Sequence, residues 1–195
     1  QPARRALTRE HTLAFPHERA SIRDLEALFT SLPAPSAAMR HGFFRASFIG
    51  PAWLRKTGGP SVAISGLPGW QGKRFLSADS ATNVLAEGDT FRESLAMRVV
   101  HGVSQVDGKP GVALHYVPQD GKPAPTPWRW VRDELRAVDD DTLLGFTVVD
   151  LPLLRRMAFP FLLTRERDVG ADEFDVDVAV VGSGFGGSVS ALRLA

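Results

Sequence analysis

Residues 95–117 read LAMRVVHGVSQVDGKPGVALHYV. The first part alternates in the manner of a half-buried strand, with one side formed by Leu95, Met97 and Val99. Asp107-Gly108 is a strong turn signal, and a second strand-like run follows over residues 111–117. Because only a short segment separates the two runs, this stretch predicts an antiparallel hairpin with a longer loop.

Short extended runs separated by turn residues lie on both sides of this hairpin. They are residues 43–49, 62–64, 73–77, 128–137 and 142–149. A break is expected at Gly58-Gly59-Pro60. Short strands at this spacing are typical of antiparallel sandwiches and barrels. The pattern predicts an antiparallel β-barrel or strongly curved sheet over residues 40–150.

One helix is expected before the barrel and one after it. Ser21 is a good N-cap, and residues 22–32 carry one apolar face that ends before Pro33. The apolar stretch 151–163 contains prolines and is expected to form a short helix that closes one end of the barrel. The predicted domains are therefore a basic arm (1–20), a barrel-like accessory domain (21–163) and a polar linker (164–173), followed by a second domain (174–195).

The second domain begins with FDVDVAVVGSGFGGSVSALRLA, residues 174–195. An apolar run, a G-x-G-x-x-G turn and a run without Gly or Pro predict a strand, a turn and a helix, the opening of a dinucleotide-binding βαβ unit. In such a unit Gly182 permits the tight turn, Gly184 lets a pyrophosphate approach the backbone, and Gly187 lets the helix pack on the strand. The alternative is a glycine-rich turn that binds nothing. Because the sequence stops inside this helix, we expect a fragment of a longer protein.

The stretch VVGSGFGGSVSALRLA resembles the FAD-binding opening of the glucose-methanol-choline (GMC) oxidoreductases, in particular their cholesterol-oxidase-like branch. The resemblance covers residues 174–195 only. It implies FAD as the cofactor and oxidation of an alcohol or sterol-like substrate. It also implies that the FAD pyrophosphate is held by Gly182, Ser183, Gly184, Phe185, Gly186 and Gly187. The family's catalytic histidine lies far towards the C-terminus, so no catalytic residue is assigned, and NAD remains an alternative cofactor until further sequence decides.

The composition is that of an ordinary globular protein, with 44% hydrophobic and 23% charged residues. A net charge of +1 gives no indication of a nucleic-acid partner. The absence of cysteine excludes disulfides and thiolate metal sites, and it fits a cytoplasmic location. No signal peptide or transmembrane segment is expected.

Several side chains in the barrel region are candidates for a site, each with a simpler structural explanation. Trp128 and Trp130 share one side of their run and either line an apolar cavity or pack in the core, while Trp53 and Trp70 are expected near a rim. The other candidates are His101 and His115 as acid–base or metal groups, Asp139-Asp140-Asp141 as a calcium loop, and Arg155 and Arg156 as an anion site. In each case a solvated or structural role is the simpler explanation, so no metal site is predicted. Asp133 and Glu134 are expected on opposite faces of a strand, so they cannot act as a carboxylate pair.

Together these patterns predict an α+β protein, in which an antiparallel barrel precedes the truncated first β–α of a Rossmann-type FAD-binding domain. The preferred function is that of an FAD-dependent oxidoreductase, inactive as this fragment, acting on a small alcohol or lipid-like substrate. The Gly69–Gly72 segment with Trp70 resembles the glycine–tryptophan signature of lipocalin-like barrels. The alternative function is therefore a lipocalin-like module that binds a hydrophobic ligand.

Overall fold

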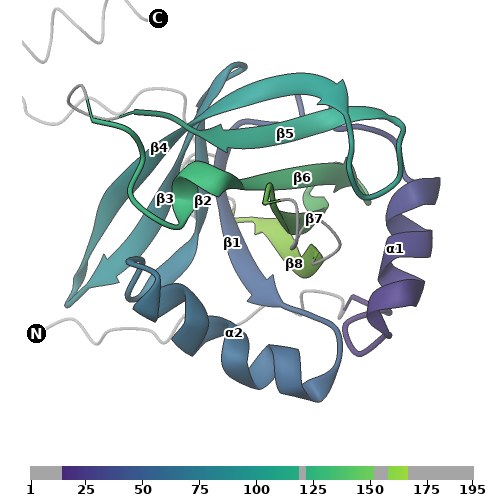
Figure 1. Cartoon of the computed structure of the whole chain (residues 1–195), viewed down its shortest axis with the longest axis horizontal. Coiled ribbons are helices and arrows are strands. Elements are labelled where there is room, and N and C mark those ends of the chain that lie inside the picture. The colour runs from purple at the N-terminus through teal and green to yellow at the C-terminus, as the bar shows by residue number, and fades with distance from the viewer. Residues whose placement is uncertain (1–14, 119–121, 152–157, 167–195) are drawn as a thin grey trace, which may run out of the picture.

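A computed structural model describes residues 15–118, 122–151 and 158–166 of the chain. Eight antiparallel strands form a closed barrel in which each strand pairs with the next along the chain (Figure 1). The strands are β1 (Gly42–Phe48), β2 (Trp70–Ser77), β3 (Ser80–Glu87), β4 (Thr90–Val103), β5 (Pro110–Tyr116), β6 (Val131–Ala137), β7 (Thr142–Val149) and β8 (Ala158–Arg165). Two α-helices, α1 (Ile22–Ser31) and α2 (Ala52–Ile64), and a short 3₁₀-helix (Trp128–Trp130) complete the described elements.

The barrel is closed by pairing of its first strand with its last. β1 and β8 are antiparallel, with Phe44 opposite Arg165 and Phe48 opposite Phe161. One further hydrogen bond, from the Glu166 N–H to the Phe43 carbonyl, extends this seam. Because every strand has two neighbours, the described sheet has no unpaired edge.

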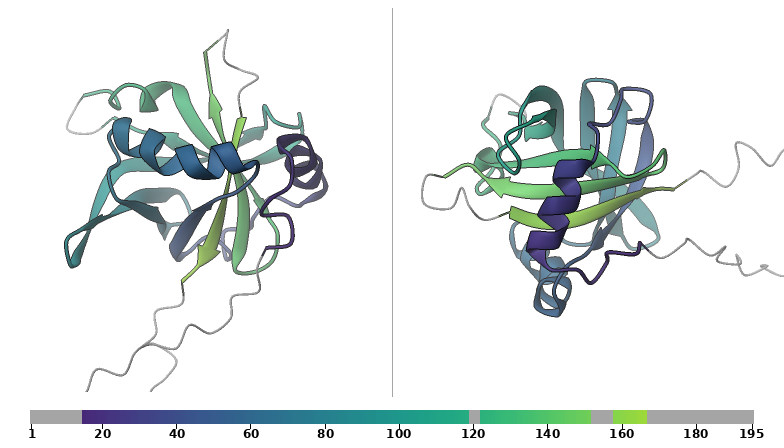
Figure 2. Two further views of the ribbon diagram at one scale, coloured as in Figure 1. Left: turned by 90° about the horizontal axis from the view of Figure 1, so that it is seen from below. Right: turned by 90° about the vertical axis from the view of Figure 1, so that its right-hand side faces the viewer.

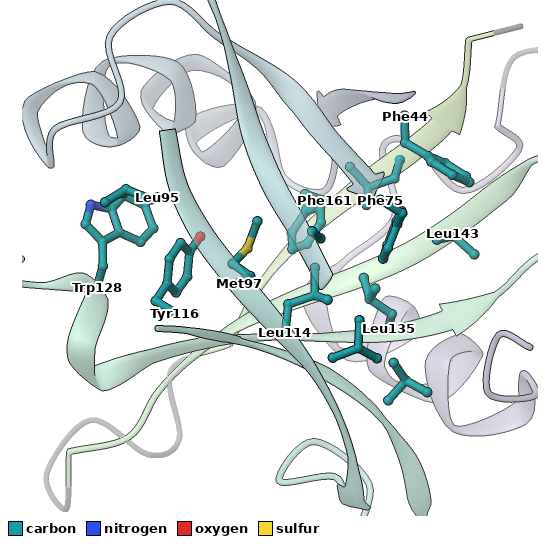
Figure 3. Packing of buried hydrophobic residues seen from close by; sticks show 14 of the residues in the cluster. Phe44, Phe75, Leu95, Met97, Leu114, Tyr116, Trp128, Leu135, Leu143 and Phe161 are labelled. Carbon is teal, nitrogen blue, oxygen red and sulfur yellow. The ribbon is translucent and has the colours of Figure 1, made fainter. Parts of the chain in front are cut away.

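Alternate residues of the strands fill the barrel with apolar side chains. Phe44, Phe75 and Leu114 belong to this interior cluster and are at most 3% exposed. Figure 3 shows how side chains from most of the strands meet there, with Trp128 beside Tyr116 at one end and Phe44 near Leu143 at the other. Burial of this apolar surface is the main favourable term in the folding of such a barrel.

Helix α1 packs against the outside of the barrel, across β7 and β8 (Figure 2, right). Its fully buried Leu25 and Phe29 form a second apolar cluster with outward-facing residues such as Phe146. The helix begins where expected, because the Ser21 hydroxyl accepts a hydrogen bond from the Asp24 N–H (3.2 Å). Strand β7 is therefore covered on both faces, by the barrel interior and by α1.

Helix α2 connects β1 to β2 and lies across the barrel in the left panel of Figure 2. It approaches the barrel closely at Gly58, where an added Cβ would lie 2.4 Å from the Phe48 ring. A side chain at this position would hold the helix away from the strand, so the close packing depends on glycine.

The expected antiparallel barrel is confirmed, but the expected α+β class is wrong. In the described part of the chain, each strand pairs antiparallel with its sequence neighbour, and no Rossmann β–α unit is present. The stretch 174–195, on which that class depended, lies outside the described residues, as does most of the basic arm over residues 1–20.

Several local predictions are also wrong. Residues 62–64 and the expected break at Gly58-Gly59-Pro60 lie inside α2. The stretch 151–163 was expected to be helical, yet its described end forms strand β8, which extends to Arg165. Strand β8 is buried on both faces, so the alternation that identifies a strand is missing there. Strand β3 was not predicted at all.

No helix among the described residues has the length and apolar character needed to cross a membrane.

Candidate ligand cavity

A cavity of about 270 Å³ lies between α2 and the interior of the barrel. One face of α2 contributes Trp53, Leu54, Thr57, Gly58, Ser61 and Val62 to its wall, and Ser65 follows directly after the helix. The opposite wall is formed mainly by inward-facing residues of seven strands, all except β4, together with the 3₁₀-helix. The lining is predominantly apolar, as in sites that bind small organic molecules.

Three of the four tryptophans line this cavity. Trp53 is 56% exposed at the rim, on α2. Trp128 is buried at 7% exposure, its indole N–H donates to the Ser65 carbonyl (2.7 Å), and its ring centroid lies 4.9 Å from that of Tyr116. The Trp128 hydrogen bond therefore ties the 3₁₀-helix to the turn that follows α2.

The deep wall of the cavity carries a buried ion pair. Lys73 on β2 and Asp133 on β6 lie 2.8 Å apart, from Nζ to Oδ2, with 2% and 3% of their side-chain surfaces exposed. Isolated charges at this depth are very unfavourable, and a pair is tolerated only where further hydrogen bonds satisfy both groups. The neighbouring side chains supply those bonds.

The Lys73 ammonium donates to Asn83 Oδ1 (3.0 Å), and it lies 3.3 Å from Tyr116 Oη and 3.5 Å from Met97 Sδ. It also lies 5.6 Å from the centroid of the Trp70 ring, close enough for a cation–π interaction. The ammonium has three hydrogens, so these partners and Asp133 satisfy its donors.

The Asp133 carboxylate accepts from two hydroxyl groups in addition to Lys73. Tyr116 donates to Oδ2 (3.1 Å) and Thr147 donates to Oδ1 (2.7 Å). Burial, together with the nearby Asp133 carboxylate, raises the pKa of Tyr116 well above its ordinary value. Tyr116 therefore remains protonated, and available as a donor, throughout the physiological pH range.

An irregularity in the pairing of β3 with β4 lies beside Asn83. The register shifts between Ala81 and Asn83, and Leu95, whose carbonyl accepts from Asn83 Nδ2 (3.4 Å), has a φ of 57°. This left-handed conformation is uncommon for a residue with a side chain. Bulges commonly redirect a side chain next to a functional site, and here Asn83 also accepts from the Trp70 indole N–H (3.1 Å).

The structure separates several candidates that the sequence grouped together. Trp128 lines the cavity, whereas Trp130 is 36% exposed and does not. Trp53 and Trp70, expected near a rim, both contribute to the lining. Asp133 and Glu134 lie on opposite faces as predicted, since Glu134 accepts from the Gln105 N–H (2.8 Å) outside the barrel.

The histidines and the acidic turn do not form a site. His101 lies opposite Val112, and His115 lies opposite Arg98, so the two imidazoles are not paired across the hairpin. No group of three potential metal ligands occurs among residues 15–118, 122–151 and 158–166, and this includes Asp139-Asp140-Asp141. Arg155, Arg156 and the loop Gly182–Gly187 lie outside the described residues.

No sequence pattern identified Lys73, Asn83, Tyr116 and Thr147 as components of one cluster. The sequence did contain one indication of a buried charge. Asp133 lies on the same face of its strand as the apolar residues Val131 and Leu135. A carboxylate on an apolar side predicts a buried partner. The alternation alone does not identify which distant residue supplies the positive charge.

Comparisons with known proteins support the fold only. No protein-family model matches the chain, and no curated protein matches it. A crystal structure of a protein from Thermomonospora curvata is similar, with a TM-score of 0.57 and 19% sequence identity over 76% of this chain and 90% of that chain. The chain thus shares an overall barrel architecture with that protein.

Proposed function

We propose that the barrel binds a small, predominantly apolar molecule in the cavity beneath α2. The observation that carries this proposal is the cavity itself. Well-packed protein interiors contain few voids larger than one water molecule. The cavity beneath α2 measures about 270 Å³ and is bordered by three tryptophans. An eight-stranded barrel has an interior that side chains can just fill or that can hold one small ligand.

The volume limits the size of the ligand. Pockets that enclose drug-sized molecules measure about 300–1,000 Å³, so a cavity of about 270 Å³ is at or just below the lower end of that range. It suits a compact molecule, or the apolar end of a longer one whose remainder extends past Trp53 at the rim.

Binding is tested by partly filling the cavity. Val149 is half-buried on the inner side of β7 and lines the cavity, whereas Val103 is 69% exposed at the end of β4. Val149→Phe places a ring in the cavity, and Val103→Phe is the matched control. Methylcyclohexane and cyclohexanol are suitable probes, with intrinsic tryptophan fluorescence and calorimetry as readouts.

We expect both probes to change the tryptophan emission, because three of the four indoles border the cavity. Val149→Phe should weaken binding by at least about tenfold, the effect of losing ~1.4 kcal/mol of contact. Val103→Phe should bind as the unaltered chain does. Absence of binding by the unaltered chain, or equal binding by both variants, would refute the proposal.

A second function rests on sequence alone. We propose from residues 174–195 that the protein is an FAD-dependent oxidoreductase of alcohols, with the FAD pyrophosphate held by Gly182–Gly187. A cytoplasmic location is likewise proposed from the absence of cysteine. The test is the flavin absorbance of the complete gene product and of its Gly184→Asp variant. A colourless product that takes up no FAD would remove this second proposal and leave the first unaffected.

A further inference from the structure

The polar wall of the cavity carries two opposite charges. Among the described residues that line it, Lys73 and Asp133 are the charged ones, and they are in direct contact at 2.8 Å. The charges of Lys73 and Asp133 sum to zero. A charged ligand would therefore lose its hydration in the cavity without finding an unpaired opposite charge there. The penalty for such a transfer is large.

The hydrogen-bond donors of this wall are largely engaged within it. Lys73 is satisfied by Asp133, Asn83 and their neighbours, as described above. The Tyr116 and Thr147 hydroxyls both donate to Asp133, and the Trp70 indole donates to Asn83. These groups have no free N–H or O–H to offer to a ligand.

Acceptor capacity remains beside the ion pair, at Asp133 and Thr147. In the part of the chain that the structure describes, Asp133 Oδ1 accepts a single hydrogen bond, from Thr147. A carboxylate oxygen has two acceptor positions, and a hydroxyl that donates retains its own lone pairs. Thr147 is half-buried and lines the cavity, whereas Asp133 is 2% exposed, so Thr147 is the more accessible residue of the two.

We propose that the cavity selects uncharged ligands that carry a hydrogen-bond donor, such as a hydroxyl group, and that Thr147 and Asp133 accept from it. This inference rests on the proposed ligand-binding function. The apolar remainder of the ligand packs against the tryptophans, and its donor reaches the Thr147 side of the polar wall. Thr147 thereby determines which ligands are preferred, in addition to contributing to the binding strength.

The test uses the full chain and a matched set of cyclohexyl compounds. Methylcyclohexane reports on the apolar cavity. Cyclohexanol adds a donor, and methoxycyclohexane retains only the acceptor oxygen. Cyclohexanecarboxylate adds a negative charge, and cyclohexylammonium adds a positive charge. Dissociation constants are measured by calorimetry at neutral pH.

We expect cyclohexanol to bind on the order of tenfold tighter than methoxycyclohexane, as a hydrogen bond to a charged group gives. Both charged compounds should bind more weakly than cyclohexanol. If methylcyclohexane and every other compound fail to bind, the ligand-binding function itself is refuted. If methylcyclohexane binds but the ether or a charged compound equals or exceeds the alcohol, only the specificity inference is overturned.

Variants of two threonines locate the effect. Thr147→Val removes one of the two proposed acceptors and should reduce the preference for the alcohol over the ether, with the affinity for methylcyclohexane measured in the same variant as the apolar reference. Thr57→Val is the matched control, because Thr57 also lines the cavity but its hydroxyl donates to the Trp53 carbonyl within α2 (2.9 Å) and is not bonded to the Asp133 carboxylate. Thr147→Ser keeps the hydroxyl and should keep the preference. If it does not, or if Thr57→Val removes the preference equally, the assignment to Thr147 is wrong.

Discussion

Replacement of Lys73 by methionine should strongly destabilise the barrel. Met has a similar length, but it leaves the Asp133 carboxylate buried at 3% side-chain exposure without a positive partner. Breaking a buried ion pair by removing one partner costs about 3–5 kcal/mol, because an uncompensated charge remains. The two hydroxyl donors from Tyr116 and Thr147 remain, so we expect the lower part of this range.

The double variant Lys73→Met/Asp133→Leu should recover most of this loss. Replacing both members of a buried pair with apolar residues of similar volume is often neutral or stabilising. Here the Tyr116 and Thr147 hydroxyls lose their acceptor, so full recovery is not expected. We therefore predict that the double variant is less destabilised than the Lys73→Met single variant, although it carries one more substitution.

The measurement is urea unfolding followed by tryptophan fluorescence, supported by thermal unfolding. A loss of 3–5 kcal/mol corresponds to a decrease in Tm of roughly 6–20 °C for a chain of this size. Asp133→Leu alone completes the double-mutant cycle. If Lys73→Met loses less than about 1 kcal/mol, or if the two single effects simply add, the pair is not coupled as the geometry indicates.

Further predictions concern α2 and the hairpin. Gly58→Ala should be less stable than Gly59→Ala by about 1–3 kcal/mol of overpacking, because the new methyl group meets the Phe48 ring at 2.4 Å while the one at Gly59 lies 3.8 Å from it. Chemical denaturation of both variants measures this difference, and equal stabilities would contradict the close packing of α2. Burial, followed by the nearby Arg132 guanidinium, lowers the pKa of His115. As the pH falls below about 6.5, the ordinary histidine value, the unfolded chain therefore binds a proton before the folded one does, and the free energy of unfolding decreases. His115→Gln should reduce this loss, and an unchanged pH profile in that variant would show that His115 does not contribute.

Strands whose apolar and polar residues alternate could be predicted from the sequence, whereas strands without this alternation could not. Residues 142–149 coincide with β7, and the 95–117 hairpin corresponds to β4 and β5. Strand β3 has the sequence SATNVLAE, in which the polar Asn83 takes an inward position between Ala81 and Leu85. A segment that supplies a polar group to the interior thus lacks the pattern that would identify it.

Helix α2 was missed because its sequence contradicts its structure. The helix contains Gly58, Gly59 and Pro60, which are all unfavourable inside a helix. A break was predicted at these residues for that reason. Tertiary packing overrides this propensity, since Gly58 permits close contact with Phe48, and both residues line the cavity. The site was hidden for a related reason: Lys73 and Asp133 are separated by sixty residues of chain and meet only when the barrel closes.

The seam between β1 and β8 has a consequence for how the protein folds. Its strands begin at Gly42 and end at Arg165, so the ring can form only after nearly all of the described chain has left the ribosome. The other six described strands can join as successive hairpins, which are local and fast, whereas the final pairing must close a long loop. Until then β1 and β8 expose backbone groups that can pair with another chain. Aggregation during synthesis should therefore depend on how quickly the last strand docks.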